Sequence, residues 1–251
     1  MKRYIVFIMA AFFAQEPWAA DMQATLQWSQ RVELSTPVSG IVQAVNVDVG
    51  DRVKKGQVLL SLDSTAYRAR VAGSRSEITR LDAEAKEDKR ELDRVLELYE
   101  RTVVATTELD QARLKLVRSQ SALAEARALL QQNQKALDDT SLRAPFDAVV
   151  VLREAAPGLN VAAGLQPQML LTVARSGEMI ARMHLASPQI DDFKTGQPVT
   201  VSVAGINHTG KIKVLGLEPI RISDELVYAV DVLFSSGETL RAGTPAVVKL
   251  P

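Results

Sequence analysis

The sequence predicts a mainly β protein into which a long α-helical hairpin is inserted. Two stretches, 34–62 and 142–173, alternate apolar and polar residues between turn signals, as half-buried short strands do. They share the same spacing of turn residues and therefore form an internal repeat. Between them, 64–140 contains no proline and is rich in Ala, Leu, Glu, Arg and Lys, which indicates helix. From residue 175 onward, glycines again separate short strand patterns.

The first 20 residues have the organisation of a secretory signal peptide. Lys2 and Arg3 precede an apolar run over 4–14, and Ala19 and Ala20 follow it. A retained membrane anchor is the alternative, but a spanning helix needs about 20 apolar residues. We therefore expect export and cleavage near Ala20. Because the chain contains no cysteine, it offers neither a disulfide nor the N-terminal cysteine that carries a lipid anchor.

The two repeated stretches match at a constant offset of 108 residues. The matching pairs are Leu34/Leu142, Pro37/Pro145, Gly50/Gly158, Val53/Val161 and Gly56/Gly164. Glycines at the same two turns predict the same backbone requirement in each copy, either a positive φ or a close approach of another segment. Gly40 is a further turn glycine of the first copy. Residues 34–63 and 141–174 therefore form one split β domain.

The helical segment 64–140 predicts an antiparallel coiled-coil hairpin. In its second half, leucines recur every seven residues with small or polar residues between them, a heptad seam made of Leu109, Ala112, Leu116, Ser119, Leu123, Ala126, Leu130, Asn133 and Leu137. The first half repeats at spacings of three and four, over Val71, Ser74, Ile78, Leu81, Ala85, Asp88, Leu92, Val95 and Tyr99. A globular bundle or a dimerising coiled coil is the alternative. The flanking repeat favours the hairpin, which leaves and returns to one place, with its turn near 101–107.

The last region, 175–251, predicts a small antiparallel β-barrel. It contains about five short strand patterns at regular spacing, and a barrel of such strands hides its edges by closing. The N-terminal segment 21–33 can add one strand to it.

Charge and composition exclude several function classes. The chain carries 30 basic and 30 acidic residues, so no net field draws it to nucleic acid. Its two histidines, His184 and His208, are too isolated for a triad or a metal cluster. Residues 205–212 imitate a phosphate-binding loop, but Ile212 stands where Ser or Thr is required, which favours an ordinary turn. We expect no catalytic residue, cofactor or metal, and hence no enzyme.

The order of these parts resembles the periplasmic adaptor, or membrane fusion protein, family (HlyD-like) of efflux and type I secretion systems. The local matches are GIVQAVNVDVGDRVKKGQVLLSLD, LRAPFDAVV, GQPVTV and LRAGTPAVV. The resemblance implies that the split β domain is lipoyl-like. It also implies a periplasmic location, an inner-membrane transporter and a TolC-type outer-membrane channel as partners, and self-association into a ring, expected to be hexameric.

The family's hairpin tip carries an arginine, a leucine four residues later and a serine seven residues after that, which engage the outer-membrane channel. Arg94 and Leu98 match this motif, and Ala105 stands at the serine position. The resemblance therefore implies that Arg94, Leu98 and Ala105 contact the channel. An ordinary surface arginine and a helix-packing leucine are the alternative. Many family members also have a membrane-proximal domain beyond the barrel, which we do not expect in this chain.

Three functions follow from the resemblance and the split β domain. The tip residues favour an adaptor of a proton-driven resistance-nodulation-division pump. The first alternative is an adaptor of an ATP-binding-cassette exporter or a type I secretion system. The second is a lipoyl- or biotinyl-like carrier or scaffold, although 64–140 replaces the turn on which a carrier presents its modified lysine.

Overall fold

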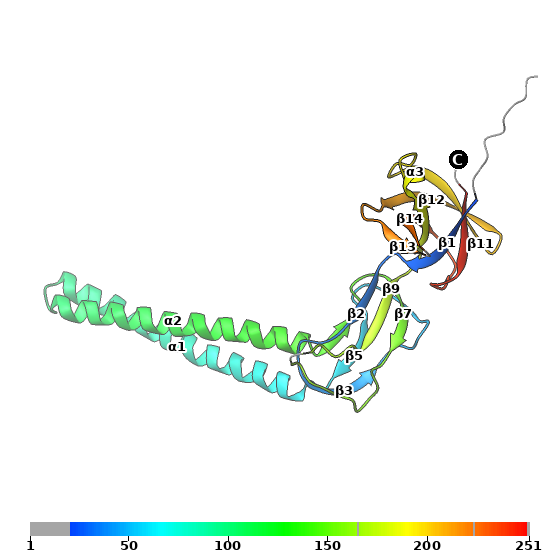
Figure 1. Cartoon of the computed structure of the whole chain (residues 1–251). Coiled ribbons are helices and arrows are strands. Elements are labelled where there is room, and N and C mark those ends of the chain that lie inside the picture. Colours follow the sequence, from blue (N-terminus) through cyan, green and yellow to red (C-terminus); the bar gives the residue numbers. More distant parts are fainter. Residues whose placement is uncertain (1–20, 165, 223, 250–251) are drawn as a thin grey trace, which may run out of the picture. The chain divides into compact units, whose positions relative to one another are not determined.

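The computed structural model describes residues 21–164, 166–222 and 224–249. The expected signal peptide, 1–20, lies outside the described residues. The chain divides into two compact units. One unit combines the segment up to Gln30 with the segment from Arg175 onward, and the other comprises Arg31–Ala174 (Figure 1).

The core of the second unit is a sandwich of two four-stranded sheets. One sheet has the order β2-β9-β7-β4, and the other has the order β6-β5-β3-β8. The strands of the first sheet are β2 (Arg31–Leu34), β4 (Arg52–Val53), β7 (Ala148–Arg153) and β9 (Leu171–Arg175). Those of the second are β3 (Gly40–Val45), β5 (Val58–Leu62), β6 (Ser141–Arg143) and β8 (Asn160–Val161). Each sheet therefore takes two strands from before the helices and two from after them.

The repeat is visible in the hydrogen bonds as well as in the sequence. The Gly50 N–H donates to the Val150 carbonyl over 2.9 Å, and the equivalent Gly158 N–H donates to the Val42 carbonyl over 2.9 Å. Gly50 and Gly158 are 108 positions apart in the sequence, and so are Val42 and Val150. The two halves are therefore copies that donate equivalent hydrogen bonds to each other. Each four-stranded sheet contains strands from both halves.

Three of the five predicted turn glycines have the positive φ that the repeat suggested. Gly50, Gly56 and Gly158 have φ angles of 97°, 82° and 88°, a region that glycine enters without steric penalty. Gly40 begins β3 without a positive φ, and an added Cβ would lie 3.4 Å from the Leu62 Cβ, an ordinary van der Waals distance. The prediction for Gly164 is wrong, because it has neither a positive φ nor a close neighbour.

A difference in loop length explains why Gly164 differs from Gly56. The first copy joins β4 to β5 through residues 54–57, whereas the second copy joins β8 to β9 through the longer segment 162–170. The constant offset therefore ends after Val161, and Gly164 is not structurally equivalent to Gly56.

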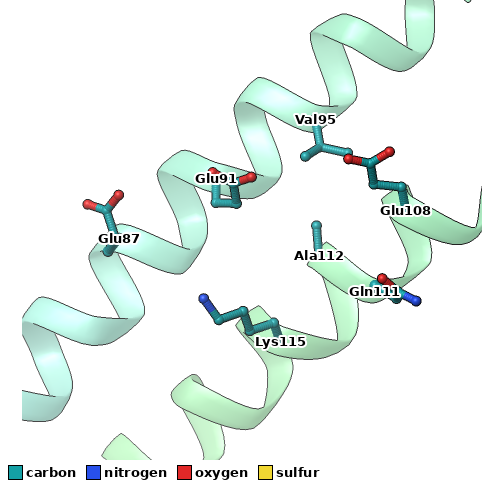
Figure 2. A pocket seen from close by; sticks show the side chains of 7 residues that line it. All are labelled: Glu87, Glu91, Val95, Glu108, Gln111, Ala112 and Lys115. Atoms are coloured by element: carbon teal, nitrogen blue, oxygen red, sulfur yellow. The ribbon is translucent and has the colours of Figure 1, made fainter. Parts of the chain in front are cut away.

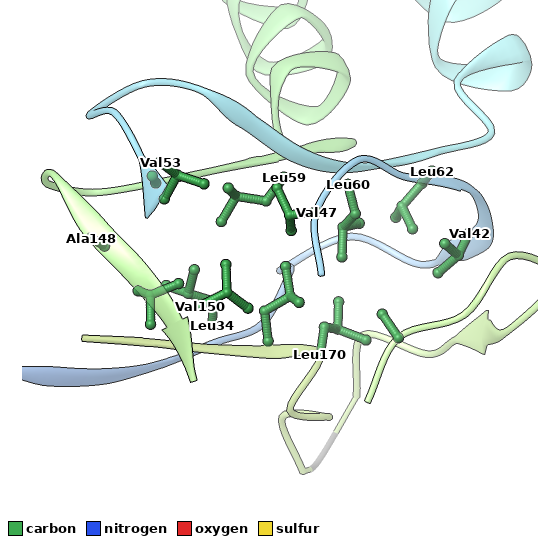
Figure 3. Packing of buried hydrophobic residues seen from close by; sticks show 14 of the residues in the cluster. Leu34, Val42, Val47, Val53, Leu59, Leu60, Leu62, Ala148, Val150 and Leu170 are labelled. Atoms are coloured by element: carbon green, nitrogen blue, oxygen red, sulfur yellow. The ribbon is translucent and has the colours of Figure 1, made fainter. Parts of the chain in front are cut away.

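Apolar side chains from both copies fill the space between the two sheets (Figure 3). Leu59, Leu60, Leu170, Leu171 and Val173 have no measurable exposure. Burying one such side chain contributes about 1.5–3 kcal/mol relative to leaving it in water. Because these residues come from segments more than 100 positions apart, the core itself holds the ends of the inserted helices together.

The inserted segment forms two antiparallel helices, α1 (Thr65–Glu100) and α2 (Thr106–Asp138), joined by 101–105 (Figure 1). Their ends meet at the sandwich, where the Leu62 N–H donates to the Thr140 carbonyl over 2.8 Å. The Tyr67 hydroxyl adds a 2.7 Å hydrogen bond to the Ser39 carbonyl. The hairpin therefore starts and finishes at the same edge of the sandwich. None of the helices described by the structure is long and apolar enough to cross a membrane.

The predicted seam lies between the helices. All nine seam residues of α2 are buried or half-buried, and so are the first eight of α1. Tyr99 is the exception, with 38% of its surface exposed. It lies in the last turn of α1, where its hydroxyl is 3.4 Å from the Thr106 hydroxyl at the start of α2. The Asn133 side chain donates to the Ser74 hydroxyl over 2.8 Å, which fixes the register of the two helices.

The other unit is a closed six-stranded β-barrel. The strand order is β10-β1-β15-β11-β12-β14, and a β10–β14 pairing closes the ring. The strands are β1 (Asp21–Trp28), β10 (Glu178–Ala186), β11 (Pro198–Val203), β12 (Ile206–Leu215), β14 (Glu225–Ser235) and β15 (Pro245–Lys249). A short β13 (Ile220–Ile222) extends β14, and α3 (Ser187–Ile190) follows β10.

The N-terminal segment 21–33 divides between the two units. Residues of β1 supply a barrel strand, as expected, and pair with both β10 and β15. Residues 31–33, which we assigned to the same segment, instead begin β2 and pair with β9 of the sandwich.

At the closure of the barrel, the Arg182 guanidinium forms two hydrogen bonds, of 2.7 and 2.8 Å, to the buried Asp231 carboxylate.

Candidate partner-binding site at the hairpin tip

The tip begins with a tight C-terminal cap on α1. The Thr102 N–H donates to the Tyr99 carbonyl over 2.9 Å, and the Val103 N–H donates to the Leu98 carbonyl over 3.0 Å. This pair of bonds is the Schellman motif, which requires a left-handed residue after the helix end and usually uses glycine there. Thr102 occupies that position with a φ of 62°. A β-branched residue in this region is a strained outlier.

The second helix begins without a side-chain cap. Ala105 is the N-cap of α2, with an extended backbone, and no side-chain hydrogen bond caps the helix. Ser, Thr, Asp or Asn normally fills this position because its side-chain oxygen accepts from a free backbone N–H. The serine of the family's tip motif would therefore stand at a capping position in this chain.

The three predicted contact residues occupy different environments. Arg94 has 67% of its side chain exposed and forms an ion pair with Glu91 on its own helix. Leu98 is half-buried, and its carbonyl accepts the Schellman hydrogen bond. Ala105 is exposed at the start of α2. All three lie within the last two turns of α1 or the connection that follows, since Arg94 is about 9 Å from the end of α1 along its axis.

Neither Thr102 nor Val103 is identified by the sequence pattern as a contact residue. Val103 has 66% of its surface exposed, whereas Val104 packs against Val95, Leu109 and Ala112 beneath the tip. The sequence predicts a turn near 101–107, but it does not indicate which of the two valines faces solvent. The absence of glycine after α1 was the signal that could have identified Thr102.

A charged layer lies about three turns below the tip. Asp88 is only 2% exposed, and its carboxylate accepts a hydrogen bond from Lys115 over 2.9 Å. The Lys115 ammonium, and the Ser119 hydroxyl more weakly, lower the pKa of Asp88, although burial acts in the opposite direction. Asp88 also raises the pKa of Lys115. The pair is therefore ionised at neutral pH, within a seam that is otherwise mostly apolar.

A hollow of about 360 Å³ opens between the helices beside this layer (Figure 2). Its polar walls are Glu87, Glu91, Glu108 and Lys115, and small Ala112 forms part of its floor. Glu87 and Glu91 are paired with Arg90 and Arg94, and Lys115 is paired with Asp88. Three of the four charged side chains are thus paired within the hairpin, so the hollow is a groove of the coiled coil and does not resemble a ligand pocket.

The segment that imitates a phosphate-binding loop and the two histidines have structural explanations. Residues 206–212 lie in β12, directly after a turn in which Gly205 has a φ of 85°, which confirms the ordinary-turn interpretation. His208 lies on the same strand with its ring 5.3 Å from that of Phe234, and His184 is exposed on β10. Over 21–164, 166–222 and 224–249, no three His, Cys, Asp or Glu side chains are grouped to hold a metal ion.

A family model described as a CzcB-like, barrel-sandwich hybrid domain matches residues 30–175. The chain belongs to the periplasmic adaptor, or membrane fusion protein, family. The match covers the whole sandwich and hairpin unit. It includes the hairpin tip but not most of the barrel.

Curated relatives of this adaptor include macrolide export proteins. The protein named macrolide export protein MacA of Yersinia pestis is 25% identical over 217 residues, which cover 80% of this chain and 58% of the relative. The protein of the same name from Escherichia coli O157:H7 is 24% identical over 216 residues, with 79% and 58% covered. The adaptor thus spans a little over half the length of the curated relatives that it matches.

Solved structures show the same fold. The membrane fusion protein Spr0693 from Streptococcus pneumoniae R6 superposes with a TM-score of 0.73 at 17% identity, over 92% of this chain and 98% of that one. A MacA–MexA chimera with the α-hairpin of Pseudomonas aeruginosa MexA gives a TM-score of 0.65 at 20% identity, over 92% and 82%. At these identities the likeness concerns the fold alone.

Proposed function

We propose that this adaptor joins an inner-membrane transporter to an outer-membrane channel of TolC type. The observation that carries the proposal is the hairpin, which leaves the sandwich of a family-matched adaptor and ends in an exposed tip where α2 lacks a side-chain cap. The helices of 36 and 33 residues extend about 50 Å at 1.5 Å per residue. This length suits a connection between two membranes and serves no purpose in a carrier domain.

Arg94, Leu98 and Ala105 form the proposed contact with the channel. Arg94 offers an exposed guanidinium, which binds carboxylates and carbonyls through several donors. The ion pair with Glu91 is exposed and weak, so a partner carboxylate can replace it. Leu98 supports the turn from below, and exposed Ala105 leaves room for close approach of a partner backbone.

The location and assembly follow from this role. We propose that the segment 1–20 exports the chain to the periplasm without a lipid anchor and that the adaptors associate into a hexameric ring. The barrel is then the part that meets the inner-membrane transporter. The sandwich is the part that packs against neighbouring copies.

The class of transporter is a separate question. The spacing of Arg94 and Leu98 favours a proton-driven resistance-nodulation-division pump. The relatives that the chain matches are named macrolide export proteins, which gives that class no particular support. An ATP-binding-cassette exporter or a type I secretion system is therefore a second candidate, distinguished by whether export in membrane vesicles requires ATP or a proton gradient.

Charge reversal at the tip tests the adaptor function. Arg94→Glu is expected to abolish export, because it places a carboxylate where the channel meets a cation. Arg90→Glu is the matched control, since Arg90 is also exposed on α1 and pairs with Glu87 in the same i,i+3 geometry. Equal export by both variants at equal protein levels would contradict tip docking.

A further inference from the structure

Thr102 occupies a backbone position that favours glycine and gains nothing from its side chain within the hairpin. Its φ of 62° is in the left-handed region, where a β-branched side chain is strained. Glycine would make the same Schellman turn without that strain. No residue in the described part of the chain hydrogen-bonds the Thr102 hydroxyl, which is exposed to solvent. The stability of the turn therefore does not account for a threonine at this position.

Val103 is equally unexplained by packing. It is 66% exposed, the most exposed large apolar residue of the hairpin. Its neighbour Val104 already closes the end of the seam against Val95 and Leu109. Replacement of Val103 by a polar residue would leave the seam intact, so its apolar surface has no role within the hairpin.

We propose that Thr102 and Val103 are specificity-determining contacts with the rim of the outer-membrane channel. This inference rests on the proposed function and adds two residues that lie outside the arginine–leucine–serine motif. The strained turn presents a free hydroxyl and an isopropyl group side by side at the end of the hairpin. They are continuous with exposed Ala105, where the first amides of α2 lack a side-chain cap.

The geometry defines the chemistry of the partner surface. A surface that fits this tip offers a small apolar depression for Val103 and hydrogen-bond acceptors for the Thr102 hydroxyl and the free amides of α2. Loops with exposed backbone carbonyls provide the acceptors, and apolar side chains between them provide the depression. A charged patch alone does not fit, because it lacks the apolar depression for Val103.

The test is the yield of outer-membrane channel that copurifies with the tagged full-length adaptor from detergent-solubilised cells, identified by mass spectrometry. Thr102→Gly keeps the turn, so its hairpin is expected to melt about 2–4 °C higher than wild type. The same variant is expected to recover about fivefold less channel, the loss typical of truncating a residue central to an interface. More stability with less binding is a combination that a purely structural role cannot produce.

Val103→Ser is expected to reduce recovery by a similar factor without lowering the melting temperature. Val117→Ser is its matched control, since Val117 is 56% exposed on α2 away from the tip and should leave recovery unchanged. Wild-type recovery by both Thr102→Gly and Val103→Ser, while Arg94→Glu recovers none, would overturn this inference and leave the proposed function standing. No channel recovered with wild type would overturn both.

Discussion

At the scale of single residues, the two copies of the repeat show when a glycine is required. Gly158 keeps the positive φ of its counterpart Gly50, because both turns return their strands to the same hydrogen-bonded position. Gly164 shares the sequence spacing of Gly56 but lies in a longer loop with an ordinary backbone. The sequence alone could not separate these cases, since five additional residues after Val161 change the geometry without changing the offset of the glycine.

This contrast predicts opposite effects of the same substitution. Gly158→Ala should lower the free energy of unfolding of the sandwich by about 1 kcal/mol, since alanine is strained at a φ of 88°. Gly164→Ala should be neutral or slightly stabilising, because nothing lies within 4 Å of the added Cβ. Chemical denaturation monitored through the β-sheet signal measures both. Equal destabilisation by the two substitutions would show that the turns are equivalent after all.

The buried Asp88–Lys115 pair makes a second residue-scale prediction. Lys115→Ala leaves a carboxylate that is 2% exposed without its main partner, so it should lower the melting temperature of the hairpin clearly. Lys86→Ala removes the exposed pair with Asp82 and should change it little. Thermal melting of the helical signal distinguishes the two. A similar effect of both changes would mean that Asp88 is hydrated in solution.

The same pair fixes the pH dependence of the hairpin. Lys115 lowers the pKa of Asp88 below its ordinary value of 3.8, so the carboxylate stabilises the folded state at any pH above that value. This stabilisation is lost only as the pH falls through the still lower folded-state pKa. The stability difference between wild type and Asp88→Asn should therefore be constant from neutral pH to about 5 and should shrink below about 4. A change in this difference near neutral pH would contradict the assigned pKa direction.

At the scale of elements, the sequence pattern predicted both helices and their turn, because the expected 64–140 with a turn near 101–107 is observed as α1 and α2 joined by 101–105. The seam alternation required two antiparallel helices, and Ser74–Asn133 and Asp88–Ser119, two heptads apart, keep one register. The pattern placed Tyr99 in the seam, although 38% of its surface is exposed. It also could not reveal the Schellman turn at Thr102, because sequence rules expect glycine there.

The uncapped start of α2 predicts an easy stabilisation. Ala105→Ser places a hydroxyl at the N-cap and should stabilise the hairpin by about 1 kcal/mol. Ala124→Ser, at an exposed position within α2, should destabilise it slightly, because serine is a poorer helix former than alanine. Helical melting curves of the two variants give the comparison. A loss of stability in Ala105→Ser would show that the N-cap lies elsewhere.

At the scale of the whole molecule, the repeat determined the architecture. Each sheet places two strands of one copy between two strands of the other, and the Leu62–Thr140 hydrogen bond joins the strands on either side of the hairpin. That organisation was readable from the sequence because the offset of 108 is preserved through most of each copy. The division of 21–33 between barrel and sandwich was not, because a strand pattern does not specify which sheet accepts it.

The sandwich should therefore fold without its insertion. Replacing 64–139 by a two-residue Asn-Gly turn leaves β5 and β6 adjacent, as the 2.8 Å bond between Leu62 and Thr140 shows them to be. The shortened protein should retain its β-sheet signal and unfold cooperatively, yet support no export. An unfolded product would mean that the helices, and not the two-sheet core, hold the halves together.

The central claim, that the hairpin tip meets an outer-membrane channel, is tested most directly by crosslinking in living cells from a photoreactive residue at Ala105. Exposed Ala124, on the same helix but far from the tip, is the matched control position. The account predicts that Ala105 captures an outer-membrane channel and that Ala124 does not. Capture of a soluble enzyme at Ala105, or of no protein at all while the chain is present at normal levels in the periplasm, would contradict it.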